Sequence, residues 1–321
     1  MFYIIAGMLN LALIGVGKWG KNYLRAVQGI RHGQIKYIVS RDSNIIKSLE
    51  GTYIHVSDYH DLLQCSDLHG VIIATPSSSH YEIVNFFLEK NIHVLVEKPL
   101  TTSYEDAKKL HALFTRRRSI VMVGHIYLHH PAFQKLVSLI PSLGKISKIF
   151  MESGNYGPFR TDASALWDWG PHDISMCLAI TKKGPKSVTA WGINALGNDA
   201  KNADIIFMKL DFDQKITAVI HTGRLFTSKV KRCIVTGSER SILFEDTSEQ
   251  KLRIYGHNDV CSSSFLKYNI EEPLKNEILD FITRIARQDR NNEDFFIGLK
   301  VIKILEAAEL SMTHNAKTIT I

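Results

Sequence analysis

Hydrophobic residues in the first 125 positions come in short continuous runs separated by amphipathic segments. The runs lie at Asn10–Ile14, Ile35–Val39, Val71–Thr75, His93–Val96 and Ile120–Val123. Continuous apolar runs of this length are typical of strands whose two faces are both buried. Helical periodicity between them, as in His80–Lys90, together with the capping-box-like Ser103-x-x-Asp106, indicates intervening helices. This alternation predicts an α/β fold with a doubly wound parallel sheet.

The pattern changes after about Pro131, where hydrophobic and polar residues begin to alternate. Strands are expected at Lys145–Met151, Ser187–Asn194, Ile205–Phe212, Ile216–Thr222, Lys229–Thr236, Ser241–Phe244 and Leu252–Tyr255, and closing helices near Leu274–Gln288 and Phe296–Ser311. Runs of strands after an alternating half indicate an α+β domain with a mostly antiparallel open sheet. We therefore expect two domains, over 8–126 and 127–321, with residues 1–7 outside the fold.

Composition narrows the class of protein. A chain of 321 residues with 45% hydrophobic residues is long enough for two globular domains and is neither disordered nor fibrous. Lys and Arg exceed Asp and Glu by 39 − 32 = 7, but the basic residues are scattered and not interleaved with aromatics, so no nucleic-acid partner is expected. The sequence holds no apolar stretch of about 18 residues, so we expect no membrane span. Four distant cysteines without a C-x-x-C pair favour a reducing cytoplasm and no metal site.

A glycine motif opens the first predicted helix. Gly15, Gly17 and Gly20 form G-x-G-x-x-G immediately after the first strand, with Lys18 and Trp19 between the last two glycines. The first glycine allows a tight turn, the second lets a pyrophosphate approach the backbone, and the third lets helix and strand pack closely. The helix N-terminus offers free N–H groups to that anion. These residues predict a dinucleotide site.

The end of the second strand, about 20 residues further on, decides between NAD and NADP. Ser40 does not repel a 2′-phosphate as an acidic residue would, and Arg41 can pair with one. NADP is therefore the favoured cofactor. Asp42 follows one or two positions late and keeps NAD as the alternative.

Two further segments carry groups suited to proton transfer. Lys98, within Glu97-Lys98-Pro99, follows the fourth strand at the edge where ligands bind in such sheets, although this tripeptide is also compatible with an ordinary loop. If a helix begins near Pro171, His172 lies in its first turn and Asp168 just before it, so that His172 could take a hydroxyl proton while Asp168 orients it. The alternatives are a packed polar histidine and a helix N-cap.

The conjunction of these motifs resembles one enzyme family. The glycine loop, Ala74-Thr75-Pro76 with His80, Glu97-Lys98-Pro99, Asp168-x-Gly170-x-His172 and the late Glu272-Pro273-Leu274 occur in the order found in the Gfo/Idh/MocA oxidoreductases, over residues 8–321. The resemblance implies a Rossmann domain over 8–126 and a substrate-binding and oligomerisation domain over 127–321. It also implies hydride transfer between nicotinamide and a sugar or cyclitol carbon. It makes Lys98 the contact of the reacting oxygen, His172 the general base or acid, and Asp168 its partner. Thr75, Pro76 and His80 would lie along the cofactor, with Glu97 and Lys98.

The resemblance extends to members from nucleotide-sugar and surface-polysaccharide pathways. On this basis we expect Tyr127, Asn155, Arg160 and Asp173 to contact a nucleotide-linked or amino sugar lying between the two domains. Many members read H-x-x-D where this chain has Ser175, which puts a secondary carboxylate in doubt. A homodimer or homotetramer is expected. A non-catalytic dinucleotide sensor is the alternative, and redox-assisted glycoside cleavage is a third reading.

Overall fold

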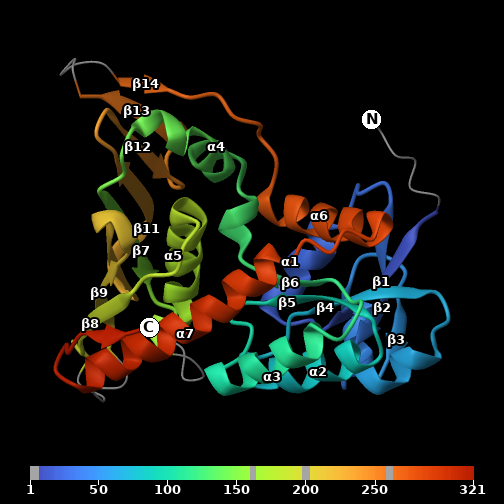
Figure 1. Cartoon of the computed structure of the whole chain (residues 1–321). Helices are drawn as coiled ribbons and strands as arrows, with labels where there is room; N and C mark the ends of the chain where they lie inside the picture. Colours follow the sequence, from blue (N-terminus) through green and yellow to red (C-terminus); the bar gives the residue numbers. More distant parts are fainter. Residues whose placement is uncertain (1–6, 160–163, 197–202, 258–262) are drawn as a thin grey trace. The chain divides into compact units, whose positions relative to one another are not determined.

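The chain divides into two units that are not contiguous in sequence. A computed structural model describes residues 7–159, 164–196, 203–257 and 263–321. By its internal contacts the first unit comprises Met1–Ile126 with Glu271–Leu299, and the second comprises Tyr127–Ile270 with Lys300–Ile321 (Figure 1). The predicted boundary after residue 126 coincides with this division. The assignment of 271–299 to the second domain is corrected.

A six-stranded sheet forms the centre of the first unit. Its order is β3-β2-β1-β4-β5-β6 and every neighbouring pair is parallel, which confirms the predicted Rossmann-type sheet. The strands are β1 Leu9–Ile14, β2 Gly33–Val39, β3 Ile54–Val56, β4 Leu68–Ile73, β5 His93–Glu97 and β6 Val121–Gly124. The sequence reading missed β3, because three partly exposed residues carry too little periodicity to signal a strand.

Helices cover both faces of this sheet. They are α1 Lys18–Ala26, α2 His80–Glu89, α3 Tyr104–Phe114 and α6 Pro273–Arg287. Figure 1 shows α2 and α3 together on one face and α1 with α6 on the other. Ser103 caps α3 as its pattern predicted, since its hydroxyl accepts from the N–H of Asp106 at 3.2 Å.

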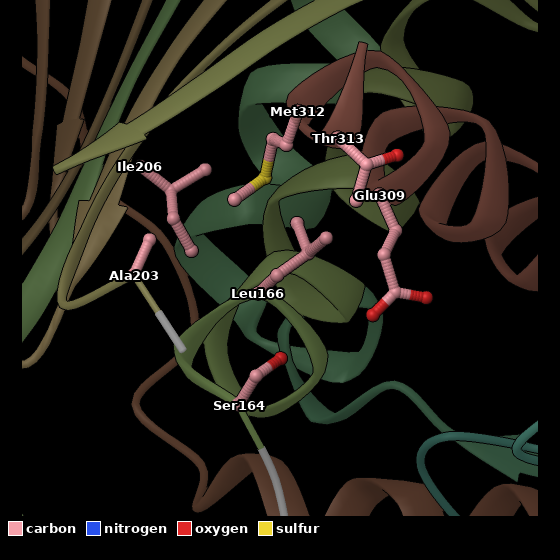
Figure 2. A pocket seen from close by; sticks show the side chains of 7 residues that line it. All are labelled: Ser164, Leu166, Ala203, Ile206, Glu309, Met312 and Thr313. Carbon is pink, nitrogen blue, oxygen red and sulfur yellow. The ribbon is translucent and has the colours of Figure 1, made fainter. Parts of the chain in front are cut away.

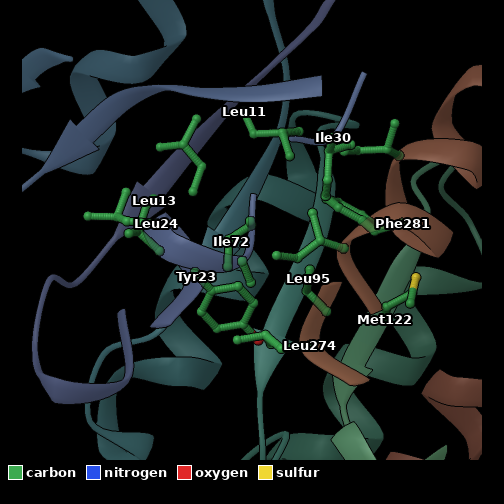
Figure 3. Close-up of a cluster of buried hydrophobic side chains, with 14 of the residues drawn as sticks. Leu11, Leu13, Tyr23, Leu24, Ile30, Ile72, Leu95, Met122, Leu274 and Phe281 are labelled. Atoms are coloured by element: carbon green, nitrogen blue, oxygen red, sulfur yellow. The ribbon is translucent and has the colours of Figure 1, made fainter. Parts of the chain in front are cut away.

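The segment from residue 271 joins the first unit because α6 supplies one side of its core. Leu274, Ile278, Phe281, Ile282 and Ile285 of α6 belong to the same buried cluster as residues of β1 and α1, part of which is drawn in Figure 3. The contact is close, since a methyl group placed on Gly33 of β2 would stand 2.3 Å from Ile282 Cδ1. Hydrophobic periodicity predicted α6 correctly but could not say which sheet it covers.

The second unit is built on a nine-stranded sheet. Its order is β14-β13-β12-β11-β7-β10-β9-β8-β15; β7 and β10 pair parallel and the other neighbours pair antiparallel, which confirms a mostly antiparallel sheet. The strands are β7 Lys148–Tyr156, β8 Ser187–Ile193, β9 Ile205–Asp211, β10 Thr217–Gly223, β11 Leu225–Thr236, β12 Arg240–Glu245, β13 Leu252–Gly256, β14 Ser263–Phe265 and β15 Ile319–Thr320.

Two helices lie on one face of this sheet, α4 Pro131–Leu139 and α5 Ala165–Thr181, and the division between the units falls within α7 Glu293–Thr313. Helix α5 contacts β7, β9 and β10, and α4 contacts β12 and β13. None of the helices in the described part of the chain combines the length and apolar composition that crossing a bilayer requires.

Helix α5 begins six residues earlier than its proline suggested. Ser164 is the N-cap, with its hydroxyl 3.4 Å from the N–H of Trp167, and Pro171 lies inside the helix. An internal proline removes one backbone hydrogen bond and normally ends a helix. Here almost every residue from Gly170 to Ile180 is buried, so packing against the sheet outweighs that loss. The expected start at Pro171 is therefore wrong, and Asp168 lies inside the helix.

Candidate active site

The glycine loop has the geometry that its motif predicts. Gly15 has φ +93°, and a methyl group on it would stand 2.8 Å from the Ala74 carbonyl oxygen. A methyl group on Gly20 would stand 2.1 Å from the Gly15 carbonyl oxygen, so helix α1 can approach β1 only without a side chain there. The first and third glycines therefore make the tight turn and the close helix–strand packing.

Gly17 differs from its neighbours because nothing lies within 4 Å of the position that its Cβ would take. It is the N-cap of α1, no side chain caps the helix, and no acidic residue lies in the first turn. The backbone N–H groups of this turn are thus open to an anion. This arrangement fits the pyrophosphate of a dinucleotide. Lys18 and Trp19 are both exposed beside it.

At the end of β2, Asp42 has a structural role, whereas Arg41 is exposed to solvent. Asp42 caps the following turn, where its carboxylate accepts from the N–H of Asn44 at 2.9 Å, and its own N–H donates to Ser40 Oγ at 3.2 Å. Arg41 is exposed. The carboxylate that kept NAD as an alternative is therefore held by the turn, whereas the Arg41 guanidinium faces solvent.

The loops after β4 and β5 are tied together by His80. Its ring nitrogens lie 2.8 Å from the Pro99 carbonyl oxygen and 3.0 Å from that of Thr75, and burial lowers the pKa of the imidazole. Because the ring is buried, His80 positions the loops that carry Thr75, Pro76 and Lys98. Contact with a cofactor at these residues stays a prediction.

Glu97 and Lys98 share a loop but differ in exposure. The Lys98 side chain is half-buried, whereas the Glu97 carboxylate is buried and accepts hydrogen bonds from Trp19 Nε1 and the Tyr23 hydroxyl, the latter at 2.7 Å. The structure thus joins Glu97 to the glycine loop, a contact that the motifs did not reveal.

In the second unit, Asp168 and His172 stand four residues apart on α5, so one turn of the helix presents both on the same side. Both side chains are half-buried, while most of the helix is fully buried. The Tyr127 ring meets the His172 ring edge to face, with centroids 5.3 Å apart. Asp168 is thus a first-turn residue and Ser164 is the N-cap, which removes the N-cap alternative for Asp168.

A buried ion pair lies directly behind this turn. Lys231 of β11 donates to Asp173 Oδ1 at 2.6 Å, and its ammonium lies 4.4 Å from the centroid of the Tyr127 ring. Ser153 donates to the other carboxylate oxygen at 2.5 Å. Lys231 was not among the residues predicted from the sequence. One feature of the sequence could have indicated it: Lys231 lies on the same face of its strand as Cys233 and Val235, and both of these are buried.

The remaining predicted site residues have different surroundings. Asp173 is fully buried and its carboxylate is engaged inside the unit, while Asn155 is half-buried on β7. Arg160 lies outside the described residues. Ser175, at the position of the expected carboxylate, is buried and donates to the His172 carbonyl oxygen at 2.8 Å. Whether Tyr127, Asn155 and Asp173 contact substrate stays a prediction.

A small pocket opens beside the first turn of α5 (Figure 2). Leu166, Ile206 and Met312 make its apolar wall, and Glu309 contributes a carboxylate. None of the predicted catalytic residues lines it, so it is separate from the Asp168–His172 pair. Within the described ranges, no three His, Cys, Asp or Glu side chains are grouped to hold a metal ion.

Both halves of the chain match models of known protein families. Residues 9–125 match the family model described as "Oxidoreductase family, NAD-binding Rossmann fold", and residues 141–243 match the "GFO/IDH/MocA C-terminal domain".

Two curated relatives and one solved structure illustrate the similarity. The scyllo-inositol 2-dehydrogenase (NADP(+)) of Bacillus subtilis is 24% identical over 85% of this chain and 84% of its own. The UDP-N-acetylglucosamine 3-dehydrogenase of Acidithiobacillus ferrooxidans is 29% identical over 43% of this chain and 44% of its own. A solved structure of the latter enzyme superposes with a TM-score of 0.85 and 21% identity, covering 97% of this chain and 99% of that one.

Proposed function

Because this chain belongs to the Gfo/Idh/MocA family of oxidoreductases, we propose that it is an enzyme that moves a hydride between nicotinamide and a hydroxyl or keto carbon of a sugar. The observation that carries the proposal is the Asp168–His172 turn. In a helix whose residues are mostly buried, a carboxylate and an imidazole one turn apart are both partly exposed. Accessible acid–base groups on a rigid element suit proton transfer.

The dinucleotide would be held by Gly15, Gly17, Gly20 and the first turn of α1, whose open N–H groups suit a pyrophosphate. When bound, its nicotinamide ring accepts or supplies the hydride. Ser40 and the exposed Arg41 favour NADP, since the guanidinium can pair with a 2′-phosphate. The NADP-dependent relative supports this preference.

The protein's own residues would handle the proton. His172 takes the proton of the substrate hydroxyl during oxidation and returns it during reduction, and Asp168 orients the imidazole. Lys98 donates a hydrogen bond to the reacting oxygen and so stabilises the charge that develops on it. Tyr127 limits the motion of His172 through the edge-to-face ring contact.

We propose a nucleotide-linked or amino sugar as substrate. The similarity to UDP-N-acetylglucosamine 3-dehydrogenase supports this class, and a formal charge of +7 suits an anionic ligand. The test is to supply UDP- and dTDP-sugars with NADP or NAD and follow the absorbance of the reduced nicotinamide. Turnover with one of them is the expected result. Tight NADP binding without turnover across the panel would instead favour a regulator.

Variants test the catalytic roles. His172→Ala and Lys98→Ala should each lower kcat by about 10²–10⁴-fold, the usual contribution of a positioned acid–base group. The matched controls are His314→Ala and Lys90→Ala, because both side chains are exposed and lie outside the proposed site. Wild-type rates in both catalytic variants would refute the assigned roles.

We also propose that the protein forms a homodimer or homotetramer through the second unit's sheet. A row of rings is contributed by β8, β9, β10 and β11: Trp191 stacks on Phe207, Phe207 on His221, and His221 meets Phe226. Trp191 is 43% exposed and the other three rings are partly exposed, and aromatic residues at the surface are enriched at interfaces. Trp191→Glu should lower the mass found by analytical ultracentrifugation, whereas a wild-type monomer would contradict the proposal.

A further inference from the structure

Two carboxyl groups in the first unit share one phenol. Tyr23 of α1 places its hydroxyl oxygen 2.7 Å from Glu97 Oε1 and 3.1 Å from Glu277 Oε1 of α6. Tyr23 and Glu277 are completely buried, and Glu97 is 8% exposed. The Tyr23 ring lies inside the hydrophobic cluster of this unit (Figure 3).

The number of protons in this cluster follows from the donors. A phenol has one proton and can donate to only one carboxylate. If both carboxyl groups were ionised, the phenol oxygen would face one of the two carboxylate oxygens with no proton between them. Two negative charges would also share a buried site. One carboxyl group must therefore carry a proton and donate to the phenol oxygen.

The surroundings of Glu97 and Glu277 decide which of the two carboxyl groups carries the proton. Burial raises the pKa of Glu97 as well, but several contacts oppose this and favour its ionised form. Glu97 accepts from Tyr23 and from Trp19 Nε1, its Oε2 lies 3.2 Å from the backbone N–H of Lys98, and the Lys98 charge is close by. Glu277 Oε2 has no hydrogen-bond partner among the described residues.

The other charged groups near Glu277 are unfavourable to its ionised form. They are Glu97 from β5, Asp280 from the same helix and Asp294 from α7, and each of the two aspartates pairs with Arg284 at 2.7 Å. Burial first, and then the charge of Glu97, raise the pKa of Glu277 well above its usual range.

We propose that Glu277 is a neutral carboxylic acid in the folded protein and a positioning residue of the dinucleotide site. Its proton is donated to Tyr23, so the Tyr23 proton is directed to Glu97. Glu97 thereby stays ionised and accepts the indole N–H of Trp19 in the glycine loop. The link to dinucleotide binding rests on the proposed function, whereas the protonation state does not.

The protonation state has a direct spectroscopic test on the full-length protein. A protonated carboxyl group has its own C=O stretching band in the infrared, separate from that of carboxylates. At neutral pH the wild type should show this band and Glu277→Gln should lack it, while Glu89→Gln, an exposed residue of the same unit, should retain it. An identical band in wild type and Glu277→Gln would overturn the proposal.

The pH dependence of the unfolding equilibrium is an independent test of the protonation state of Glu277. Above the ordinary carboxyl pKa of 4.5 the folded state holds a proton that the unfolded state has lost, so the wild type loses stability as pH rises towards the folded pKa. One proton changes the unfolding equilibrium constant by up to tenfold per pH unit. Urea unfolding of Glu277→Gln should lack this contribution relative to Glu89→Gln. Equal pH dependence in both variants would contradict a neutral Glu277.

Dinucleotide affinity tests the positioning role. Wild-type affinity for NADP should fall as rising pH ionises Glu277, and Glu277→Gln should lack this fall. Tyr23→Phe, a second variant, should weaken NADP binding by about tenfold or more at neutral pH, because one charge-assisted hydrogen bond to Glu97 is lost. A pH profile shared by wild type and Glu277→Gln would refute the positioning role. A wild type that binds no dinucleotide would refute the proposed function, while the infrared band still decides the protonation.

Discussion

Lys231 and Asp173 form an ion pair with almost no contact with water. Their side chains are 3% and 0% exposed, the Lys231 ammonium lies over the Tyr127 ring, and Asp173 directly follows His172 in the chain. Buried pairs add little net stability, but removal of one partner leaves an uncompensated charge. Each of the two charges is therefore neutralised only while the other is present. The orientation of His172, the proposed catalytic histidine, depends on the pair too, because Tyr127 contacts both Lys231 and the His172 ring.

Lys231→Met should destabilise the protein by about 3–5 kcal/mol, because Asp173 is left buried without a cation. The double variant Lys231→Met/Asp173→Asn should recover much of that loss. Urea unfolding of the two single variants and the double variant measures the coupling. Lys229→Met on the same strand is the control, since Lys229 is 58% exposed. An equal effect of Lys229→Met and Lys231→Met would contradict the buried pair.

Ser40→Asp should reverse the proposed preference for NADP. A carboxylate at the end of β2 repels a 2′-phosphate and accepts the ribose hydroxyls of NAD. The expected change is about tenfold or more in the ratio of affinities, which corresponds to about 1.4 kcal/mol. Titration with NADP and NAD measures it, and Arg41→Ala should weaken NADP binding alone. A ratio that Ser40→Asp leaves unchanged would show that cofactor choice is made elsewhere.

At the scale of elements, the turn between β1 and α1 separates two functions of glycine. Gly20 lets the helix pack on the strand, and Gly17 leaves open the space in front of the helix N-terminus. The two positions lie three residues apart in one motif, yet only one of them is needed for packing. Variants can therefore distinguish folding from binding.

Gly20→Ala should destabilise the protein by about 1–3 kcal/mol, since its methyl group would stand 2.1 Å from a backbone oxygen and the helix would have to shift. Gly17→Ala should cost less, about 1 kcal/mol or below, since nothing lies within 4 Å of its Cβ position and only the N-cap preference for Gly over Ala is lost. It should nevertheless weaken dinucleotide binding, because its methyl group fills the approach to the helix N-terminus. Thermal unfolding and NADP titration of both variants separate the effects. A stability loss in Gly17→Ala as large as that in Gly20→Ala would contradict this division.

At the scale of the whole molecule, the first unit is completed by a segment that follows it by more than 140 residues. Five side chains of α6 belong to the core built by β1, β2 and α1. Burial of each contributes about 1.5–3 kcal/mol. Their sum is comparable with the net stability of a whole domain, which is about 5–15 kcal/mol.

A fragment of residues 8–126 should therefore lack cooperative unfolding, because its apolar face is left open. The same fragment joined through a flexible linker to residues 271–299 should unfold cooperatively. Circular dichroism during a urea titration measures both. A second joined fragment with Phe281→Asp and Ile282→Asp is the matched control and should behave like 8–126 alone. Cooperative unfolding of 8–126 by itself would show that α6 is dispensable.

Much of the fold was predictable from periodicity, because continuous and alternating apolar patterns directly reflect burial on two faces or one. The strand β3 was missed because it is short and partly exposed, and the start of α5 was misjudged because burial outweighs a proline. The glycine loop and the Asp168–His172 spacing were also predictable, since each depends on neighbours within one turn. Lys231 was not, because its partner Asp173 lies 58 positions away.

The sequence by itself determined the local geometry: a glycine turn at the start of α1, a capped α3, and a carboxylate four residues before an imidazole. These features depend on backbone sterics and helical spacing, which act over a few residues. Only the tertiary structure decided that α6 completes the first core and that Tyr23 meets Glu277, 254 positions away. Such contacts arise because distant apolar faces are buried together, and local patterns do not specify which faces meet.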